Sequence, residues 1–247
     1  MASREFDVVL WGCTGFTGRL VARYFMSTIT RRLPKLRWAL AGRDEGKLHE
    51  LAASIGGGTL PLLVASNETF DTIAESTRVV LSTAGPFALY GTPVVEACVR
   101  GGCDYVDING ETGWHRSVID KYDEEARAKG VVLVPSSGFD SIPSDLGAQW
   151  MASRITQGCG RPTRRITCYA SLRGAFSGGT VASGINGDEE YGPDYLANPF
   201  LLGGARAGDD TEHTDPTAAA FDQVSSRITA TPHHRGVGCS ATLLQVL

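Results

Sequence analysis

Residues 8 to 18 read Val8-Val9-Leu10-Trp11-Gly12-Cys13-Thr14-Gly15-Phe16-Thr17-Gly18. The apolar run at the start predicts a buried β-strand, and apolar residues recur after Gly18 at helical spacing, at Leu20, Val21, Tyr24 and Phe25. The stretch is therefore predicted to form a strand, a glycine-rich turn and a helix. Such a turn presents backbone N–H groups and a helix N-terminus to an anion, usually a pyrophosphate.

The three glycines have separate roles in this prediction. Gly12 permits the tight turn out of the strand, Gly15 lets a phosphate approach the backbone, and Gly18 lets the helix pack closely on the strand. The spacing is G-x-x-G-x-x-G, because Thr14 stands where the more common motif has its second glycine. The alternative interpretation is an ordinary strand–turn–helix junction that binds nothing.

Composition excludes several classes of protein. The 247 residues carry a formal net charge of −4, so no overall basic field favours nucleic acid. The chain is large and its first seven residues lack a secretory apolar region, so its six cysteines are expected to be reduced thiols. No apolar run approaches the roughly 18 residues of a spanning helix. We expect a soluble, cytoplasmic protein, or at most a peripheral one.

Strands alternate with helices over residues 6 to 134, which predicts an α/β fold with a Rossmann-type, doubly wound parallel sheet. Later strands are expected at 38–41, 60–65, 79–82, 104–108 and 131–134. This nucleotide-binding domain is predicted to cover residues 1–150. A second, incomplete α/β or α+β domain is predicted for 151–247, with a strand at 164–172.

Four finer expectations concern helix ends and loops. Pro93 is expected to start the helix after the fourth strand, because proline suits a first helical position. A later helix is expected to start at Leu146 and to be capped by Ser144 and Asp145. Residues 177–185, which begin Ser-Gly-Gly-Thr, predict a second glycine-rich turn entering a helix, and 186–217 predict a long surface excursion.

The end of the second strand indicates the choice of cofactor. An acidic residue there would bind a ribose 2′-hydroxyl and select NAD, but Gly42 and Arg43 occupy this place, with Lys47 one turn later. A guanidinium suits a 2′-phosphate, so NADP is favoured over NAD. Asp44 is expected to cap the following helix. The alternative interpretation of Arg43 is a solvated surface arginine.

Other polar and glycine residues follow later strands, where ligands of open α/β sheets bind. Gly85 and Pro86 are expected to border the cofactor. Two polar clusters suggest a site: Asp107, Asn109 and Glu111, then Ser137, Asp140 and Ser141. Asp107 and Asp140 can instead cap helices or hold turns. No metal site is expected, because the histidines and cysteines lack ligand spacing.

These segments together resemble the saccharopine-dehydrogenase-like oxidoreductases, a group that includes the trans-acting enoyl reductases of lipid and glycolipid synthesis. The resemblance rests on Gly12–Gly18, Ala41–Arg43, Gly85–Phe87, Asp107–Glu111 and Ser137–Gly147, in that order. The Gly-Phe-Asp-Ser-Ile-Pro run at 138–143 is its most specific part. It covers residues 6 to about 205. It implies an NADP-binding Rossmann domain and a second domain that closes over the nicotinamide, with the segment at 177–180 facing the cofactor.

We therefore expect an NADP-dependent oxidoreductase that transfers hydride to or from a small or lipid-linked substrate. The alternative is an NADP-binding sensor or scaffold without turnover. The weak catalytic candidates are Asp107, Glu111 and Asp140. The predicted cofactor-binding residues are Gly12, Thr14, Gly15, Phe16, Thr17, Gly18, Arg43, Lys47, Ala84, Gly85, Pro86, Gly110, Ser137 and Gly138.

The last two predictions concern binding partners and the C-terminal end of the sequence. The expected partner is a small-molecule or lipid substrate and not a nucleic acid; peripheral association with membranes or lipid droplets and a homodimer are left open by the sequence. The chain stops within an apolar, strand-like run at 241–247. Because members of the resembling family continue further, the sequence is expected to be a fragment or to have an altered C-terminus.

Overall fold

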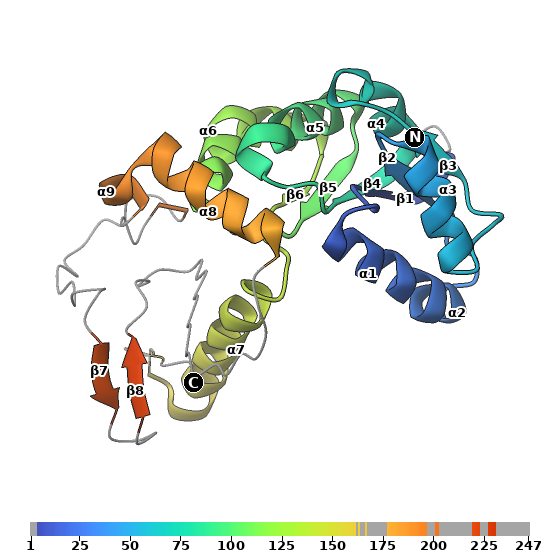
Figure 1. Ribbon diagram of the computed structural model, residues 1–247. Coiled ribbons are helices and arrows are strands. Elements are labelled where there is room, and N and C mark those ends of the chain that lie inside the picture. Colours follow the sequence, from blue (N-terminus) through green and yellow to red (C-terminus); the bar gives the residue numbers. More distant parts are fainter. Residues whose placement is uncertain are drawn as a thin grey trace. The chain divides into compact units, whose positions relative to one another are not determined.

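The computed structural model describes residues 4–161, 163, 166, 177–196, 201–202, 219–222 and 227–230 (Figure 1). The chain divides into two compact units, Met1–Ser137 with Ser177–Glu190, and Gly138–Phe176 with Tyr191–Leu247. The predicted division at residue 150 stays a prediction. The end at 241–247 and all but Ile166 of the predicted strand at 164–172 lie outside the described residues.

The first unit alternates strands and helices along the sequence. Its strands are β1 (Phe6–Trp11), β2 (Trp38–Gly42), β3 (Leu62–Val64), β4 (Thr77–Ser82), β5 (Asp104–Asp107) and β6 (Leu133–Val134). Its helices are α1 (Phe16–Tyr24), continued by a π-helical segment (Phe25–Ile29) and α2 (Thr30–Arg32), then α3 (Glu45–Ser54), a 3-10 turn (Asn67–Thr69), α4 (Asp71–Ser76), α5 (Phe87–Gly101), α6 (Thr112–Lys129) and α8 (Gly178–Tyr191). The second unit contains α7 (Ile142–Cys159), α9 (Pro193–Leu196) and the antiparallel pair β7 (Ala219–Asp222) and β8 (Arg227–Ala230).

The six strands of the first unit form one sheet in the order β3-β2-β1-β4-β5-β6. Every pairing within it is parallel, and β1 lies between β2 and β4. The predicted doubly wound sheet is confirmed. The order reverses direction between β1 and β4, and this switch point is where open α/β sheets leave a crevice beyond their carboxyl ends.

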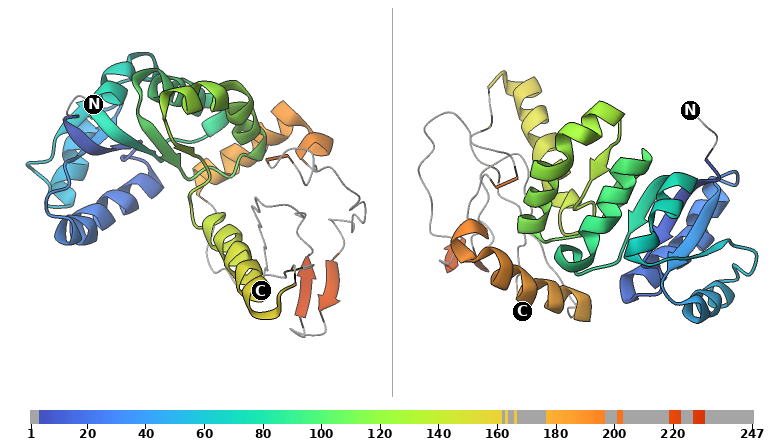
Figure 2. Two further views of the ribbon diagram at one scale, coloured as in Figure 1. Left: turned by 180° about the vertical axis from the view of Figure 1, so that it is seen from behind. Right: turned by 90° about the horizontal axis from the view of Figure 1, so that it is seen from above.

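Apolar side chains cover both faces of the sheet, as expected for parallel strands buried on both sides. Leu10 of β1 packs in a cluster with residues of α1 and α3. Its neighbours Val9 and Trp11 point to the opposite face and pack with residues of α4, α5 and α6. Helices thus lie on both faces of the sheet (Figure 2).

Helix α5 begins at Phe87, so the expectation that Pro93 starts it is wrong; Pro93 lies inside the helix. The cause is a cap that comes from another part of the chain. The two carboxylate oxygens of Glu111 accept hydrogen bonds from the backbone N–H groups of Phe87 and Ala88, both at 2.7 Å. These are two of the amides that a helix start leaves without an intrahelical acceptor.

The opposite end of α5 receives the guanidinium of Arg4. Arg4 donates to the carbonyls of Gly101 at 2.6 Å and Gly102 at 3.0 Å, at the C-terminal end of α5. It also donates to Ala74 at 2.7 Å and Glu75 at 2.6 Å, near the end of α4. A cation at helix C-termini is stabilising, because carbonyl oxygens there carry partial negative charge.

Two further expectations need correction. Helix α7 begins at Ile142 rather than Leu146, so Ser144 and Asp145 lie within its first turn and do not precede it. Ser141 precedes the helix, and Pro143 takes an early position that suits its missing N–H. The predicted start of the surface excursion, residue 186, is too early. Helix α8 continues to Tyr191, and α9 follows at 193–196.

We expect Gly18→Ala to lower the free energy of unfolding by about 1–3 kcal/mol, the usual cost of overpacking. A Cβ at Gly18 would lie 2.4 Å from the Gly12 carbonyl oxygen and 2.6 Å from the Cys13 Cα, which are backbone atoms. Gly58→Ala is the matched control, because its Cβ would meet nothing within 4 Å. Denaturant titration followed by tryptophan fluorescence measures both; equal midpoints would contradict close packing at Gly18.

Candidate functional site

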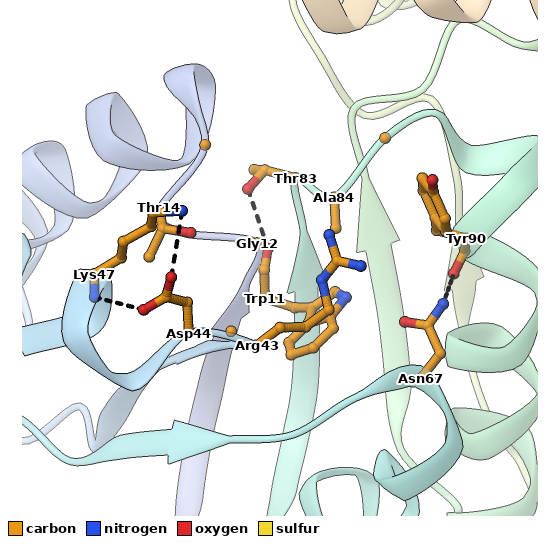
Figure 3. Close-up of a pocket in the computed structure, with 13 residues that line it drawn as sticks. Trp11, Gly12, Thr14, Arg43, Asp44, Lys47, Asn67, Thr83, Ala84 and Tyr90 are labelled. Atoms are coloured by element: carbon orange, nitrogen blue, oxygen red, sulfur yellow. Dashed lines mark hydrogen bonds and ion pairs between the residues drawn. The ribbon is translucent and has the colours of Figure 1, made fainter.

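A cavity of about 240 Å³ lies beyond the carboxyl ends of β1, β2 and β4 (Figure 3). Several residues predicted to bind the cofactor line it: Gly12, Thr14, Gly15, Arg43, Lys47, Ala84 and Gly85. The sequence reasoning did not include the other lining residues in a site: Trp11, Gly42, Asp44, Asn67, Thr83 and Tyr90. The cavity therefore brings the loops after three strands together at the switch point of the sheet.

The glycine loop has the geometry that its predicted roles require. Gly12 has a φ of 75°, and a Cβ there would lie 2.7 Å from the Ala84 Cβ. Gly18 packs against the backbone of the turn, as described above. A Cβ at Gly15, in contrast, would meet only the Gly12 carbonyl oxygen, at 3.4 Å. The space in front of Gly15 is thus open to a ligand.

The N-terminus of α1 is open as well. Gly15 precedes this helix and has no capping side chain, and its first turn contains no acidic residue. Helix α3, in contrast, is capped by Asp44, whose carboxylate accepts a hydrogen bond from the Lys47 N–H at 3.0 Å. A carboxylate of Glu111 occupies the start of α5. Of these three helix starts, α1 leaves its N–H groups for an outside anion, and a pyrophosphate fits there.

The two cations at the end of β2 differ in their surroundings. Lys47 forms an ion pair with Asp44, with 3.3 Å between Nζ and Oδ2. Hydrogen bonds from Lys47, the backbone N–H first, lower the pKa of Asp44. The Arg43 guanidinium lies over the ring of Tyr90, with 5.7 Å between Cζ and the ring centroid. In the part of the chain that the structure describes, no carboxylate forms an ion pair with Arg43.

The first polar cluster forms a buried network at the end of β5. Asp107 accepts hydrogen bonds from the Tyr105 hydroxyl at 2.9 Å and the Ser136 N–H at 2.8 Å. Asn109 donates to Asp107 from its side chain at 2.6 Å and from its N–H at 3.0 Å. Burial raises the pKa of Asp107, while these hydrogen bonds act in the opposite direction. Asp107 therefore holds the turn between β5 and α6.

Glu111 also has its hydrogen bonds within the fold. Besides the two amides of α5, it accepts a hydrogen bond at 2.7 Å from the hydroxyl of Ser183 in α8. Ser177 caps α8 by accepting from the Thr180 N–H at 3.2 Å, which confirms the predicted helix. Because α8 begins at Gly178, the glycines expected to form a turn before the helix lie in its first turn instead. The carboxylates of Asp107 and Glu111 are both engaged in holding the fold.

His115 joins this network and was not singled out in the sequence. Its Nδ1 lies 3.1 Å from the Ser136 hydroxyl, which donates to Asn109 at 3.3 Å. Burial, and then the nearby charge of Arg116, lowers the pKa of His115 to about 4. The imidazole is therefore neutral near pH 7 in the folded protein. A single histidine inside a helix gave no signal of this contact, because Ser136 comes from a distant loop.

The remaining predicted residues lie outside the cavity lining. Phe16 is exposed at the start of α1, and Thr17 follows it. Pro86 precedes α5, Gly110 is exposed, and Ser137 donates its hydroxyl to the Val134 carbonyl at 2.7 Å. Gly138 and Asp140 belong to the second unit. The roles of all these residues stay predictions.

Two further observations bear on the kind of site. Within the described ranges, no group of three or more His, Cys, Asp or Glu side chains is placed to hold a metal ion. None of the helices in those ranges combines the length and the apolar character needed to cross a membrane.

A parallel sheet in this order, with a glycine turn and an open helix N-terminus at its switch point, defines a dinucleotide-binding Rossmann domain. Residues 8–134 match the family model of the saccharopine dehydrogenase NADP-binding domain. The chain belongs to this oxidoreductase family, and NADP is the cofactor of its first domain. The expectations of family, fold class and cofactor are confirmed.

Several curated relatives of the chain come from mycobacteria. The chain is 40% identical over 160 residues to a trans-acting enoyl reductase of Mycobacterium leprae, which covers 62% of this chain and 37% of the relative. It is 38% identical over 190 residues to a trans-acting enoyl reductase of Mycobacterium tuberculosis, with coverage of 74% and 44%. The chain spans about half the length, or less, of the curated relatives it matches.

A solved structure supports the fold. The apo form of saccharopine dehydrogenase (L-Glu forming) from Saccharomyces cerevisiae aligns with a TM-score of 0.50 at 19% sequence identity. The alignment covers 62% of this chain and 32% of the yeast chain.

Gly15→Val should weaken NADPH binding by at least about ten-fold, or about 1.4 kcal/mol, because the side chain would enter the open space at α1. The fold should survive, since a Cβ there meets one atom at ordinary contact distance. Titration of NADPH fluorescence measures the affinity, and circular dichroism checks folding. A folded variant with wild-type affinity would show that the pyrophosphate binds elsewhere.

Arg43→Ala should weaken NADPH binding by roughly one to two decades, because a charge-assisted hydrogen bond to a phosphate contributes about 1.5–3 kcal/mol. NADH, which has a hydroxyl at the 2′ position, should bind almost unchanged. Higher salt should weaken NADPH binding more than NADH binding, since Arg43 is exposed. Calorimetric titration of both cofactors decides this; equal weakening of both would make Arg43 a surface arginine.

His115→Gln should reduce the acid sensitivity of the fold. The pKa of His115 falls from 6.5 to about 4 on folding, so the unfolded chain binds more protons between these values. Its contribution to stability is complete above about pH 6.5 and is lost as the pH falls towards about 4. Asp107, whose pKa is raised, acts with the opposite sign.

The difference between the wild type and His115→Gln isolates the histidine from Asp107. Denaturant titrations at several pH values should show that the wild type loses about 1–3 kcal/mol more than the variant across this window. Parallel curves for the two proteins would mean that His115 titrates normally in the folded state.

Proposed function

We propose that this chain is the cofactor-binding part of an NADPH-dependent enoyl reductase. The acceptor would be a carbon–carbon double bond conjugated to an acyl carbonyl, carried on a small or a lipid-linked molecule. The observation that supports the proposal most is the uncapped N-terminus of α1 beside the open space at Gly15, within a domain of an NADP-dependent family. The enoyl substrate is inferred from the relatives, which are named trans-acting enoyl reductases.

The residues of the chain suit the parts of the cofactor that they would hold. The N–H groups at the start of α1 would bind the pyrophosphate, and Arg43 would bind the 2′-phosphate. Ala84 and Gly85, which follow β4, would border the central part of the cofactor on the other side of the switch point. The bound nicotinamide supplies the hydride, and the protein supplies position and the exclusion of water.

One observation favours a second candidate, an NADP-binding sensor or scaffold without turnover. The carboxylates of Asp107 and Glu111 accept three or more hydrogen bonds each from the fold. Carboxylates held in this way are poorly placed to exchange a proton with a substrate. The sensor would bind NADPH and leave it unoxidised.

Single-turnover oxidation of bound NADPH distinguishes the two. The protein is loaded with one equivalent of NADPH and mixed with enoyl thioesters of short and long acyl chains, and NADPH absorbance is followed. An enoyl reductase should consume the NADPH and yield the saturated acyl product, and Gly15→Val should not. Tight NADPH binding with no oxidation by any acyl length would favour the sensor and contradict the reductase.

A further inference from the structure

We propose that Tyr90 determines cofactor selectivity by holding Arg43 in position for the 2′-phosphate of NADP. Tyr90 acts through Arg43 and is therefore a positioning residue. The proposal rests on NADP as the cofactor of this domain and on the predicted role of Arg43. It does not depend on which molecule accepts the hydride.

The ring of Tyr90 is placed to hold a cation. Tyr90 lies in the first turn of α5, is 40% exposed and forms part of the cavity wall. The Arg43 Cζ lies 5.7 Å from its ring centroid, within the roughly 6 Å at which a guanidinium is attracted by an aromatic face. Figure 3 shows both side chains on the same side of the cavity, away from Lys47 and Asp44.

The backbone of Tyr90 is itself fixed. Its N–H donates to the Pro86 carbonyl at 3.1 Å, in the first turn of α5. Its carbonyl accepts a hydrogen bond at 3.3 Å from the Asn67 side chain, which comes from the 3-10 turn after β3. The ring is thus attached to segments that follow two different strands. A rigid platform reduces the conformational entropy that Arg43 must lose when it meets a phosphate.

Arg43 has a competing partner close by. Glu68 has a lowered pKa, caused first by a hydrogen bond from Ser66 and in smaller part by the charge of Arg43. The Glu68 carboxylate already accepts from the Ser66 hydroxyl and forms no ion pair with Arg43 within the described residues. Without the Tyr90 ring, Arg43 would be free to turn towards Glu68, and a phosphate would then compete with this carboxylate.

Lys47 does not replace Arg43 in this role. Its ammonium is paired with Asp44, so a phosphate would have to break that contact or accept a site with a neighbouring negative charge. Selectivity for the 2′-phosphate therefore depends on Arg43, and the position of Arg43 depends on Tyr90.

The alternative role of Tyr90 is direct contact with the adenine ring. NADPH and NADH share the adenine, so loss of such a contact would weaken both cofactors equally. It would also persist after Arg43 is removed. The positioning role predicts the reverse in both respects, and a double-mutant cycle separates them.

The test is calorimetric titration of NADPH and NADH into the wild type, Tyr90→Leu, Tyr90→Phe, Arg43→Ala and the double variant Arg43→Ala/Tyr90→Leu. Tyr90→Leu should weaken NADPH binding by about two- to five-fold, the range of an exposed cation–π contact, and leave NADH unchanged. Tyr90→Phe keeps the aromatic face and should bind NADPH like the wild type. In the Arg43→Ala background, Tyr90→Leu should have no further effect.

Several results would overturn the proposal. These are equal losses for NADPH and NADH, a further loss in the Arg43→Ala background, failure of Tyr90→Phe to restore binding, or a wild type that does not prefer NADPH. Circular dichroism and denaturant midpoints confirm that each variant is folded. The hydride-transfer experiment is independent, because a non-reducing NADP sensor would give the same titrations.

Discussion

The close contact between α1 and the turn that precedes it determines the geometry of the cofactor domain. Gly18 lies against the backbone of Gly12 and Cys13, where even a methyl group would overlap. This contact places the N-terminus of α1 at the carboxyl edge of the sheet. The same turn presses Gly12 against Ala84, so the loops after β1 and β4 are held together. Gly12 and Gly18 are both in close contact with neighbouring atoms, so Gly15, which lies between them, is the glycine of the turn that faces open space.

The charged groups at their ends distinguish α3 and α5, which are capped by side chains of the fold, from α1, whose start is available to a ligand. Helix α5 has a carboxylate at its start, from Glu111, and a guanidinium at its end, from Arg4. Helix α3 has Asp44 at its start. In each case a charged side chain of the protein itself offsets the partial charge at the helix end. Helix α1 has neither a capping side chain nor an acidic residue at its start. An anion that approaches the switch point therefore meets unsatisfied N–H groups at α1 and N–H groups already bonded to a carboxylate at α3 and α5.

Sequence reasoning succeeded where the determining residues are local. Glycine spacing in the first turn and alternating strands and helices were sufficient for the sheet, and Asp44 was correctly expected to cap α3. It failed where the cause is distant. Pro93 looked like a helix start because the cap of α5, Glu111, is 24 residues from Phe87. Tyr90 gave no signal, since its contact with Arg43 exists only after β2 and β4 take places on either side of β1.

The discontinuity of the first unit has a consequence for the order of events during synthesis. The sheet is encoded by residues up to Val134, but α8 enters the same unit only after an intervening segment of the second. The hydroxyl of Ser183 reaches Glu111 across 72 residues of sequence. A nascent chain can therefore pair all six strands before the ribosome has made α8. Until then, Glu111 holds the start of α5 without the hydrogen bond that Ser183 donates in the finished fold.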